Sequence, residues 1–302
     1  MIRRKLKAYF AIAALLIVGG LLLLWGVIGN FDRTFLILGY RGEGYPEPFY
    51  TDAILLVRIN KVQKNRSVNV ISLPRDLAVD VKGEILKLNS IYAAELKKTA
   101  SARRAADTLV YSFEKGLGVN IDGHVIIDFS KFLALVEETG GLEVEVGNSF
   151  VDYNYPDDET FDYKTIAFEQ GKQVLGAARA LEYVRSRHAE GEEGSDFARN
   201  QRQLKLAQSL IRRIQGMTQN ERIDFIRLAK DLLATNTPAG IRTLDLMRLA
   251  AFSKNINIQT KFNTIGPELV CPSIGEEGEY MLLLCTADSV ARMKNLLAGH
   301  SF

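Results

Sequence analysis

Short apolar runs alternate with helix-forming segments along most of this chain, and this alternation limits its possible folds more than any other feature. Runs rich in Ile, Leu and Val predict buried strands at 34–38, 53–59, 67–73 and 125–127. Two later strands are expected at 256–262 and 280–284. Longer segments predict helices at 101–115, 129–138, 174–183, 197–214, 221–233, 241–253 and 289–297. Without an internal repeat or a long linker, the pattern predicts one layered α/β domain with a central mixed sheet flanked by helices.

Three local signals refine this outline. Asp128 directly precedes the helix predicted at 129–138, and Asp196 precedes the one at 197–214, so both are candidate N-caps. Gly240 is a weaker start for the helix at 241–253. The stretch 152–163 is rich in acidic residues and tyrosine, which predicts an exposed loop or flap.

The N-terminal segment predicts a membrane anchor. Residues 9–28 carry no charge and are mostly apolar, whereas residues 1–8 hold four cations. About 20 apolar residues span a bilayer core, and a basic flank favours a cytoplasmic side. We therefore expect a cytoplasmic tail at 1–8, a transmembrane helix at 9–28 and an extracytoplasmic domain at 34–302. A cleaved signal peptide is the alternative, but its apolar region is usually shorter and residues 26–30 make a poor cleavage site.

The charge balance excludes one class of partner. The chain holds 38 basic and 36 acidic residues, and four of the basic ones lie in the N-terminal tail. The rest of the chain is therefore slightly acidic, whereas a nucleic-acid-binding domain is strongly basic on one face. We expect no nucleic-acid partner, and any cationic site must be local.

Cys271 and Cys285 are the two cysteines of the chain and lie fourteen residues apart. Outside the membrane they could form one disulfide that closes a hairpin-like segment. Two unpaired buried thiols are the alternative. Without histidine neighbours, they do not form a zinc site.

The segment 183–203 is the strongest candidate for a ligand site. It places four arginines, with Asp196 and Gln203, on either side of a glycine-marked loop. A guanidinium is always charged and matches phosphate oxygens in pairs, and phosphate also suits the start of the helix predicted at 197–214. The segment therefore predicts a diphosphate site built from Arg185, Arg187, Arg199 and Arg202.

Further polar groups stand at the ends of predicted strands, where ligands usually bind in α/β sheets. Each one alone has an ordinary structural explanation, as a strand end, a turn or a local ion pair. These residues are Asp52, Arg75, Asp76, Lys87, Asn89 and Asp122.

Seven blocks together resemble the LytR-CpsA-Psr family. In chain order they read TDAILLVRIN, VISLPRD, KLNSIY, VNIDGHVIIDF, ALVEETGGLEVEV, GKQVLGAARALEYVRSRH and SDFARNQRQ. The likeness runs from about residue 34 to at least 215, with the order and spacing of the family. It implies a membrane-anchored phosphotransferase that moves a glycan phosphate from a polyprenyl-diphosphate-linked glycopolymer to a peptidoglycan hydroxyl. Teichoic acids and capsular polysaccharide are the donor classes that it implies for this step of cell-wall assembly.

The resemblance also implies roles for individual residues. Asp52, Arg75, Arg185 and Arg187 are the expected catalytic set, and Asp52 is the expected ligand of Mg²⁺ or Mn²⁺. Asp76, Asp122 and Asp196 are expected to support them. The diphosphate head group is assigned to Arg75, Lys87, Asn89, Arg185, Arg187, Arg199, Arg202 and Gln203.

One position departs from the family pattern. The family commonly reads GxDxR shortly after the first strand, whereas this chain reads LGYRGEGY, so that Arg41 stands where the aspartate falls. Glu43 is the nearest carboxylate. Either Glu43 replaces the missing ligand, or Asp52 and the substrate phosphates hold the metal without it.

Two other functions fit parts of the sequence. A polyprenyl-diphosphate glycan hydrolase would use the same arginines with water as the nucleophile. A non-catalytic envelope regulator is the second alternative, although the near-neutral exterior and the lack of a DNA-binding module argue against direct regulation. No GxSxG elbow or Walker loop suggests covalent or nucleotide-driven chemistry.

Overall fold

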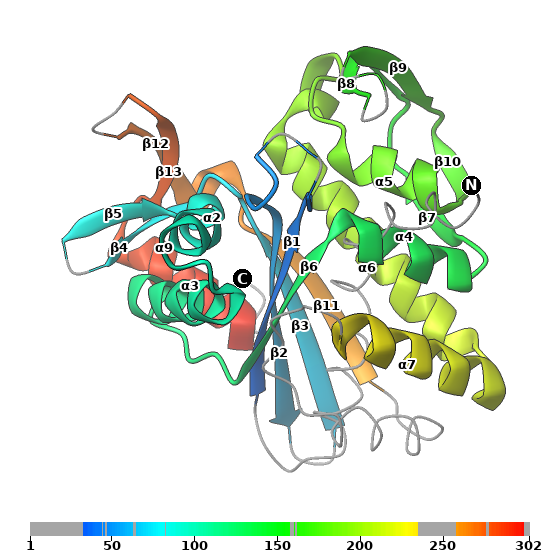
Figure 1. The fold of residues 1–302 in the computed structure, drawn as a ribbon, viewed down its shortest axis with the longest axis horizontal. Helices are drawn as coiled ribbons and strands as arrows, with labels where there is room; N and C mark the ends of the chain where they lie inside the picture. The colour runs from blue at the N-terminus through cyan, green and yellow to red at the C-terminus, as the bar shows by residue number, and fades with distance from the viewer. Residues whose placement is uncertain are drawn as a thin grey trace.

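A five-stranded mixed sheet forms the centre of the part of the chain that the structure describes (Figure 1). The structure, a computed structural model, describes residues 33–43, 45, 47–62, 65–81, 83–157, 160, 162–234, 258–275 and 278–298. The strand order is β11-β3-β2-β1-β6, in which β2 runs antiparallel to both neighbours, while β1 with β6 and β3 with β11 are parallel pairs. The strands are β1 (Arg33–Tyr40), β2 (Thr51–Val62), β3 (Asn65–Leu73), β6 (Gly123–Asp128) and β11 (Ile258–Thr264).

Helices cover both faces of this sheet (Figure 1). Successive strand residues point to opposite faces, so Phe35 and Ile37 belong to one buried core and Leu36 and Leu38 to the other. The first core is covered by α4 (Phe129–Glu138), α5 (Ala177–Arg185), α6 (Asp196–Gly216) and α7 (Gln219–Ala234). The second is covered by α2 (Leu88–Thr99), α3 (Ala102–Leu117) and α9 (Ala287–Ala298). The predicted central mixed sheet flanked by helices is confirmed.

Most predicted elements are present, but the helices on either side of the sheet differ from the prediction in two places. The helix expected at 174–183 begins only at Ala177, because residues 174 and 175 end strand β10 (Gly171–Leu175), which pairs with β7 (Leu142–Val146). Helix α2 was not predicted. Its N-cap residue, Lys87, makes no side-chain capping hydrogen bond, so the sequence carries no start signal there.

The acidic stretch at 152–163 is not the predicted loop. Its described residues belong mainly to two antiparallel strands, β8 (Phe150–Pro156) and β9 (Tyr163–Phe168). Strand alternation places Asp152 on the same face as Phe150, and Asp152 is fully buried. The β8–β9 pair therefore presents a buried carboxylate to the domain.

The two predicted N-caps differ in outcome. The Asp128 side chain accepts a hydrogen bond from the backbone N–H of Lys131, as expected. For α6 the prediction is wrong, because Ser195 is the N-cap and its Oγ accepts from the Ala198 N–H. The carboxylate of Asp196 pairs instead with arginine side chains.

A disulfide closes a hairpin at the C-terminal side of the domain. Cys271, in strand β12 (Val270–Ile274), is bridged to Cys285, which directly follows strand β13 (Tyr280–Leu284), with a Cα–Cα distance of 5.1 Å. A parallel bridge from Leu282 to Leu77 joins this hairpin to the segment before β4 (Ala78–Val81), which pairs with β5 (Glu84–Lys87). The bridged alternative is thus the one that the structure adopts.

The predicted anchor at 9–28 and the helix at 241–253, with its start at Gly240, lie outside the described residues. Within the part that is described, no helix combines the length and apolarity needed to span a bilayer. Both elements remain predictions from the sequence.

Candidate functional site

The direction of β2 creates the site. Because β2 runs antiparallel to β1, its first residues lie beside the end of β1, with Thr51 opposite Tyr40. The end of β3 lies on the other side, with Leu73 opposite Ile54. Arg41, Asp52 and Arg75 follow or occupy these strand ends, so that residues far apart in the sequence meet at one edge of the sheet.

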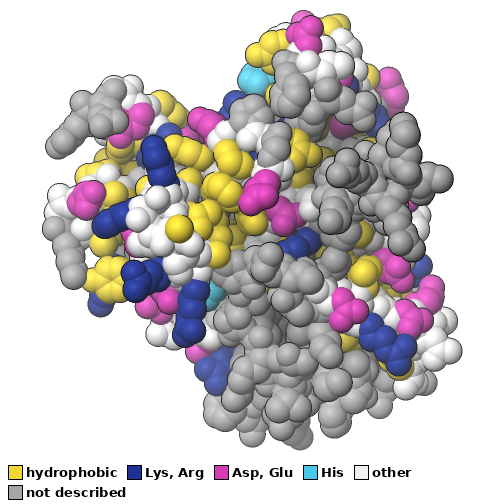
Figure 2. Space-filling model, in the orientation of Figure 1, with side chains coloured by type: hydrophobic (Ala, Val, Ile, Leu, Met, Phe, Trp, Pro, Cys, Tyr) yellow, Lys and Arg dark blue, Asp and Glu magenta, His cyan; other side chains and the backbone are white. Residues whose placement is uncertain are grey.

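A pocket of about 350 Å³ opens at this edge, between the sheet, α5 and α6 and the β8–β9 strands. Figure 2 shows hydrophobic and acidic side chains on the neighbouring surface, between the α2 side at left and the β8–β9 lobe at upper right. Among the described residues, the polar lining consists of Arg41, Arg75, Arg185, Arg187, Arg199, Gln203, Glu47, Asp52, Asp157 and Asp162. The remainder of that lining is Tyr45, Phe129, Pro156, Tyr163 and Val184.

Asp52 is held between two guanidinium groups. Its Oδ2 accepts from Arg41 Nε at 2.9 Å, and its Oδ1 accepts from Arg75 Nη1 at 2.7 Å. Burial alone raises the pKa of a carboxyl group, but Arg41, Arg75 and Arg199 outweigh this effect and hold the Asp52 pKa well below its ordinary value. Asp52 is therefore an ionised anchor for two arginines and a weak proton acceptor.

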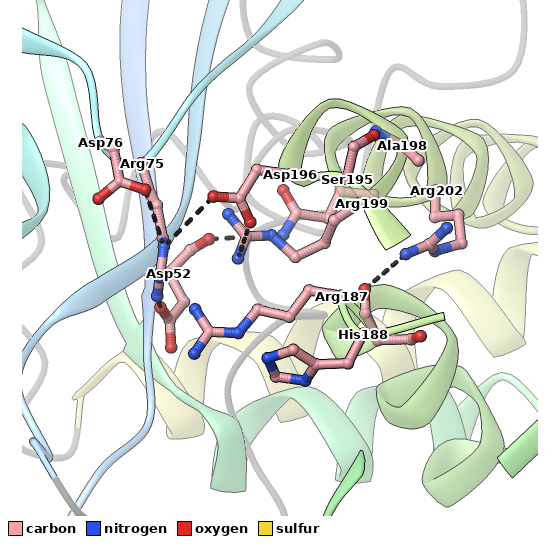
Figure 3. Close-up of polar contacts among 12 residues, drawn as sticks. Asp52, Arg75, Asp76, Arg187, His188, Ser195, Asp196, Ala198, Arg199 and Arg202 are labelled. Atoms are coloured by element: carbon pink, nitrogen blue, oxygen red, sulfur yellow. Dashed lines mark hydrogen bonds and ion pairs between the residues drawn. The ribbon is translucent and has the colours of Figure 1, made fainter. Parts of the chain in front are cut away.

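Two further carboxylates orient Arg75 (Figure 3). Its Nε lies 3.4 Å from Asp76 Oδ2 and 3.9 Å from Asp196 Oδ2. Burial lowers the Arg75 pKa, but the charges of Asp52, Asp196 and Asp76 raise it by more. The Arg75 pKa is therefore above its ordinary value. The predicted supporting roles of Asp76 and Asp196 fit this geometry.

Arg199 is a buried cation with unused donors. Its side chain is only 3% exposed, and its Nη1 lies 3.0 Å from Asp196 Oδ1. Its Nε and Nη2 have no hydrogen-bond partner. An unsatisfied buried donor costs about 1–3 kcal/mol, and more when it is charged. Because Arg199 also lines the pocket, an anion bound there would satisfy these donors.

The backbone around Arg187 is fixed by a residue that the sequence interpretation missed. Asp152 Oδ2 accepts from Ser186 Oγ at 2.7 Å and from the N–H groups of Arg187 and His188, both at 3.2 Å. The Arg187 side chain extends toward Asp52 in Figure 3 and lines the pocket. The alternation of Phe150 and Asp152 was the one available signal that this carboxylate is buried.

Arg185 and Gln203 complete the pocket-facing set. The Arg185 guanidinium lies 4.7 Å from the ring centroid of Phe129 and 5.3 Å from that of Tyr155, so two aromatic faces support it. Gln203 Nε2 lies 3.5 Å from the backbone oxygen of Asp52, and its Oε1 is buried without a partner. Both residues line the pocket as predicted.

Arg202 does not belong to the diphosphate site. Its guanidinium donates to the backbone oxygens of Tyr183, Ser186 and Glu193, and to the Glu193 carboxylate at 2.7 Å. It points away from the pocket because it is one residue before Gln203 on the helix, and neighbouring helix positions face different directions. Its role is to hold the α5–α6 connection.

Lys87, Asn89 and Asp122 also lie outside the pocket lining. Lys87 donates to Asp76 Oδ1 and to the backbone oxygen of Tyr280, both at 2.8 Å, so it reaches the site only through Asp76. Asn89 is buried in α2. Asp122 pairs with Arg33 and accepts from the Thr34 N–H, at the opposite end of β1 from Arg41. The structure therefore places Lys87, Asn89 and Asp122 away from the pocket lining, contrary to the position expected from the sequence.

The carboxylates present do not fit the expected metal site. Glu43 is exposed and does not line the pocket, which corrects its assignment as a substitute ligand. Both oxygens of Asp52 already accept from arginine. No group of three or more His, Cys, Asp or Glu side chains suited to a metal occurs within the described ranges. A protein site for Mg²⁺ usually supplies one or two carboxylates, and here the expected ligand, Asp52, is already paired with two arginines.

Comparison with known proteins identifies a family that the sequence matches. The model of the LytR_cpsA_psr family matches residues 31–292. The polyisoprenyl-teichoic acid–peptidoglycan teichoic acid transferase TagV of Bacillus subtilis (strain 168) is 30% identical over 180 residues, which cover 58% of this chain and 42% of TagV. TagT of the same strain, also named as a polyisoprenyl-teichoic acid–peptidoglycan teichoic acid transferase, is 26% identical over 202 residues, or 67% of this chain and 56% of TagT. The chain spans about half the length of the curated relatives it matches.

Solved structures share the fold. The crystal structure of B. subtilis TagV aligns with a TM-score of 0.61 at 22% identity, covering 90% of this chain and 98% of that one. TagT bound to LIIa-WTA aligns with a TM-score of 0.64 at 21% identity, covering 91% of each chain. At this level of identity the comparison establishes the architecture, and the ligand site rests on the residues described above.

Proposed function

The chain belongs to the LytR_cpsA_psr family, and from this premise we propose that it transfers a glycan phosphate from a polyprenyl-diphosphate-linked glycopolymer to a peptidoglycan hydroxyl. The names of its relatives TagV and TagT, both teichoic acid transferases, support this reaction class. They favour a teichoic acid over capsular polysaccharide as the donor.

The observation that carries the proposal is the buried guanidinium of Arg199, which keeps two unsatisfied nitrogens in an arginine-lined pocket. Its Nε and Nη2 lack partners, and Arg75, Arg185 and Arg187 line the same pocket. A diphosphate diester presents two negative charges and several acceptor oxygens to such donors. Arginines held in advance by Asp52, Asp152 and Asp196 suit a reaction that depends on positioning and charge stabilisation.

The reaction proceeds by substitution at phosphorus. The acceptor hydroxyl oxygen attacks the sugar-side phosphorus, the bond from that phosphorus to the bridging oxygen breaks, and polyprenyl phosphate leaves. The hydroxyl proton passes to solvent or to the leaving phosphate. Arg185, Arg187 and Arg199 stabilise the charge that develops on the phosphoryl oxygens, and Asp52 keeps Arg75 aimed at the leaving group.

The proposed location is the outer face of the cell membrane, where lipid-linked donor and peptidoglycan meet. The predicted anchor at 9–28 would keep the pocket near the bilayer. The apolar part of its lining, Tyr45, Phe129, Pro156, Tyr163 and Val184, would contact the first isoprenoid unit or the glycan.

A labelled donor tests the proposal. The purified full chain is incubated with peptidoglycan and a polyprenyl-diphosphate glycan that carries ³²P in the sugar-side phosphate. Label on peptidoglycan supports transfer, whereas label only in free glycan phosphate would establish the hydrolase. Arg187→Gln should lower either product at least tenfold, and the exposed Arg227→Gln serves as the control.

A cell-based assay distinguishes the transferase from a non-catalytic envelope regulator. In a cell without paralogues, Arg187→Ala should abolish attachment of the wall polymer while the protein level stays normal. Intact attachment would instead support a role that does not need the pocket.

A further inference from the structure

Arg41 occupies the position beside Asp52 where a bound cation would neutralise the substrate. We propose that the Arg41 guanidinium replaces the divalent cation in this chain, so that the diphosphate is bound without Mg²⁺ or Mn²⁺. This inference rests on the proposed function and assigns Arg41 as a further substrate-binding residue.

The first support is the position of Arg41. Its Nε donates to Asp52 Oδ2 at 2.9 Å, while Arg75 donates to Oδ1 at 2.7 Å. Both oxygens that would coordinate a metal therefore accept from nitrogen. Arg41 also lines the pocket, so its guanidinium lies where the phosphates would bind.

The second support is that the backbone fixes Arg41. Its carbonyl oxygen accepts from the Phe129 N–H at 3.3 Å, which ties it to the start of α4. The next residue, Gly42, has φ +99°, a conformation that favours glycine, and its N–H donates to the Pro48 oxygen at 2.8 Å. A side chain on such an anchored segment is placed in advance for a ligand.

The third support is electrostatic. Two guanidinium groups already contact Asp52, and three more arginines line the described part of the pocket. A divalent cation at Asp52 would be repelled by both of its neighbours. The other carboxylates of that lining do not cancel this repulsion at Asp52. Glu47 is largely exposed and lies 4.0 Å from Arg41 Nη1. Asp157 and Asp162 belong to the β8–β9 side of the pocket.

A guanidinium and a metal ion differ in how they can be removed. Arginine is permanently charged and covalently attached, whereas a divalent ion exchanges with solvent and is removed by a chelator. Binding of a diphosphate to this chain should therefore survive chelation.

Binding of geranyl diphosphate tests this directly. The probe is titrated into the full chain by calorimetry, once with EDTA and once with MgCl₂. The expected Kd values agree within threefold. Arg41→Gln should raise the Kd at least tenfold in EDTA, and Arg41→Lys should restore part of the loss. The exposed Arg227→Gln is the control, and thermal melting checks that each variant is folded.

Metal retention gives an independent readout. Equilibrium dialysis with Mn²⁺ and geranyl diphosphate should leave the wild type with less than 0.2 Mn²⁺ per chain, an order-of-magnitude threshold for an absent site. Arg41→Asp places a second carboxylate beside Asp52 and should retain about one Mn²⁺.

The outcomes separate the two proposals. If the wild type binds the probe only with Mg²⁺, or retains one Mn²⁺ per chain, the Arg41 inference is overturned and the proposed function stands. If the probe does not bind under either condition, the diphosphate site itself is wrong, and both proposals fall.

Discussion

The buried carboxylate of Asp152 accepts a hydrogen bond from the backbone N–H of Arg187 at 3.2 Å. The same oxygen also accepts hydrogen bonds from Ser186 Oγ and the His188 N–H, so one side chain fixes three consecutive residues. Asp152 comes from β8, whereas Arg185 ends α5. Strand β8 therefore fixes the backbone from which the Arg187 side chain extends, although most residues of β8 and β9 lie away from the pocket.

Replacement of Asp152 should separate positioning from simple charge loss. Asp152→Asn keeps the shape but weakens the acceptor, since a charged acceptor makes stronger hydrogen bonds than a neutral one. We expect transfer to fall about tenfold, with a loss of about 1–3 kcal/mol in unfolding free energy. Asp224→Asn, an exposed position on α7, is the matched control. Unchanged transfer in Asp152→Asn would show that the Ser186–His188 segment keeps its conformation without the Asp152 carboxylate.

Arg199 and Arg202 lie three residues apart on α6 and are equally buried, yet substitution should affect them in opposite ways. Arg199→Met removes a buried charge with two unsatisfied nitrogens, so we expect unfolding free energy to stay within about 1 kcal/mol of the wild type or to rise. Diphosphate binding should weaken at least tenfold, because the pocket loses its innermost donors. Chemical denaturation and calorimetry measure the two quantities on the same sample.

Arg202→Met should instead destabilise the fold. The substitution leaves three backbone oxygens and the Glu193 carboxylate without their donor, and breaking a buried pair costs about 3–5 kcal/mol. Binding of the diphosphate probe, measured well below the melting temperature, should change less than threefold. A large loss of binding in a folded Arg202→Met protein would show that Arg202 contributes to the ligand site.

The depressed Asp52 pKa predicts how its contribution depends on pH. A carboxyl group whose pKa is lower in the folded state stabilises the protein above its unfolded pKa, near 3.9, and loses this effect as the pH falls toward the folded value. The difference in unfolding free energy between the wild type and Asp52→Asn should therefore be constant from about pH 8 to pH 5 and shrink below pH 4. A difference that already declines between pH 8 and pH 5 would place the Asp52 pKa above its ordinary value.

Reduction of the Cys271–Cys285 bridge should loosen the β12–β13 hairpin. A closed loop of about 15 residues contributes about 3 kcal/mol in the chain-entropy description. Two hydrogen bonds also join the hairpin to the site. The backbone oxygen of Tyr280 accepts one from Lys87, and the Leu282 N–H donates one to the backbone oxygen of Asp76. We expect the Cys271→Ser/Cys285→Ser variant to melt several degrees lower, as calorimetry would show. An unchanged melting temperature would mean that strand pairing alone holds the hairpin.

The sequence predicted the central sheet well because apolar runs with few polar interruptions mark strands buried on both faces. The runs at 53–59 and 67–73 fall inside β2 and β3. Strands β8 and β9 were missed because their charged and aromatic residues alternate on a partly exposed pair. In such strands, composition indicates a loop while periodicity indicates a strand.

The candidate site was predicted in part for a similar reason. Spacing along the chain brought Arg185, Arg187, Arg199 and Gln203 together because they flank one turn between two helices. It could not separate Arg199 from Arg202, whose directions depend on how α6 packs. Nor could it show that Arg41 contacts Asp52, since that contact follows from the register of β1 against β2.

The antiparallel insertion of β2 between β1 and β3 has a consequence for folding. Arg41, Asp52, Arg75 and Arg199 meet only after the sheet has formed and α6 has docked on it, because no short segment of the chain contains them all. Contacts of such large sequence separation form late, after their loop-closure cost has been met. Affinity for a diphosphate should therefore arise in a single step with native structure. A partly folded chain would therefore not bind the diphosphate probe.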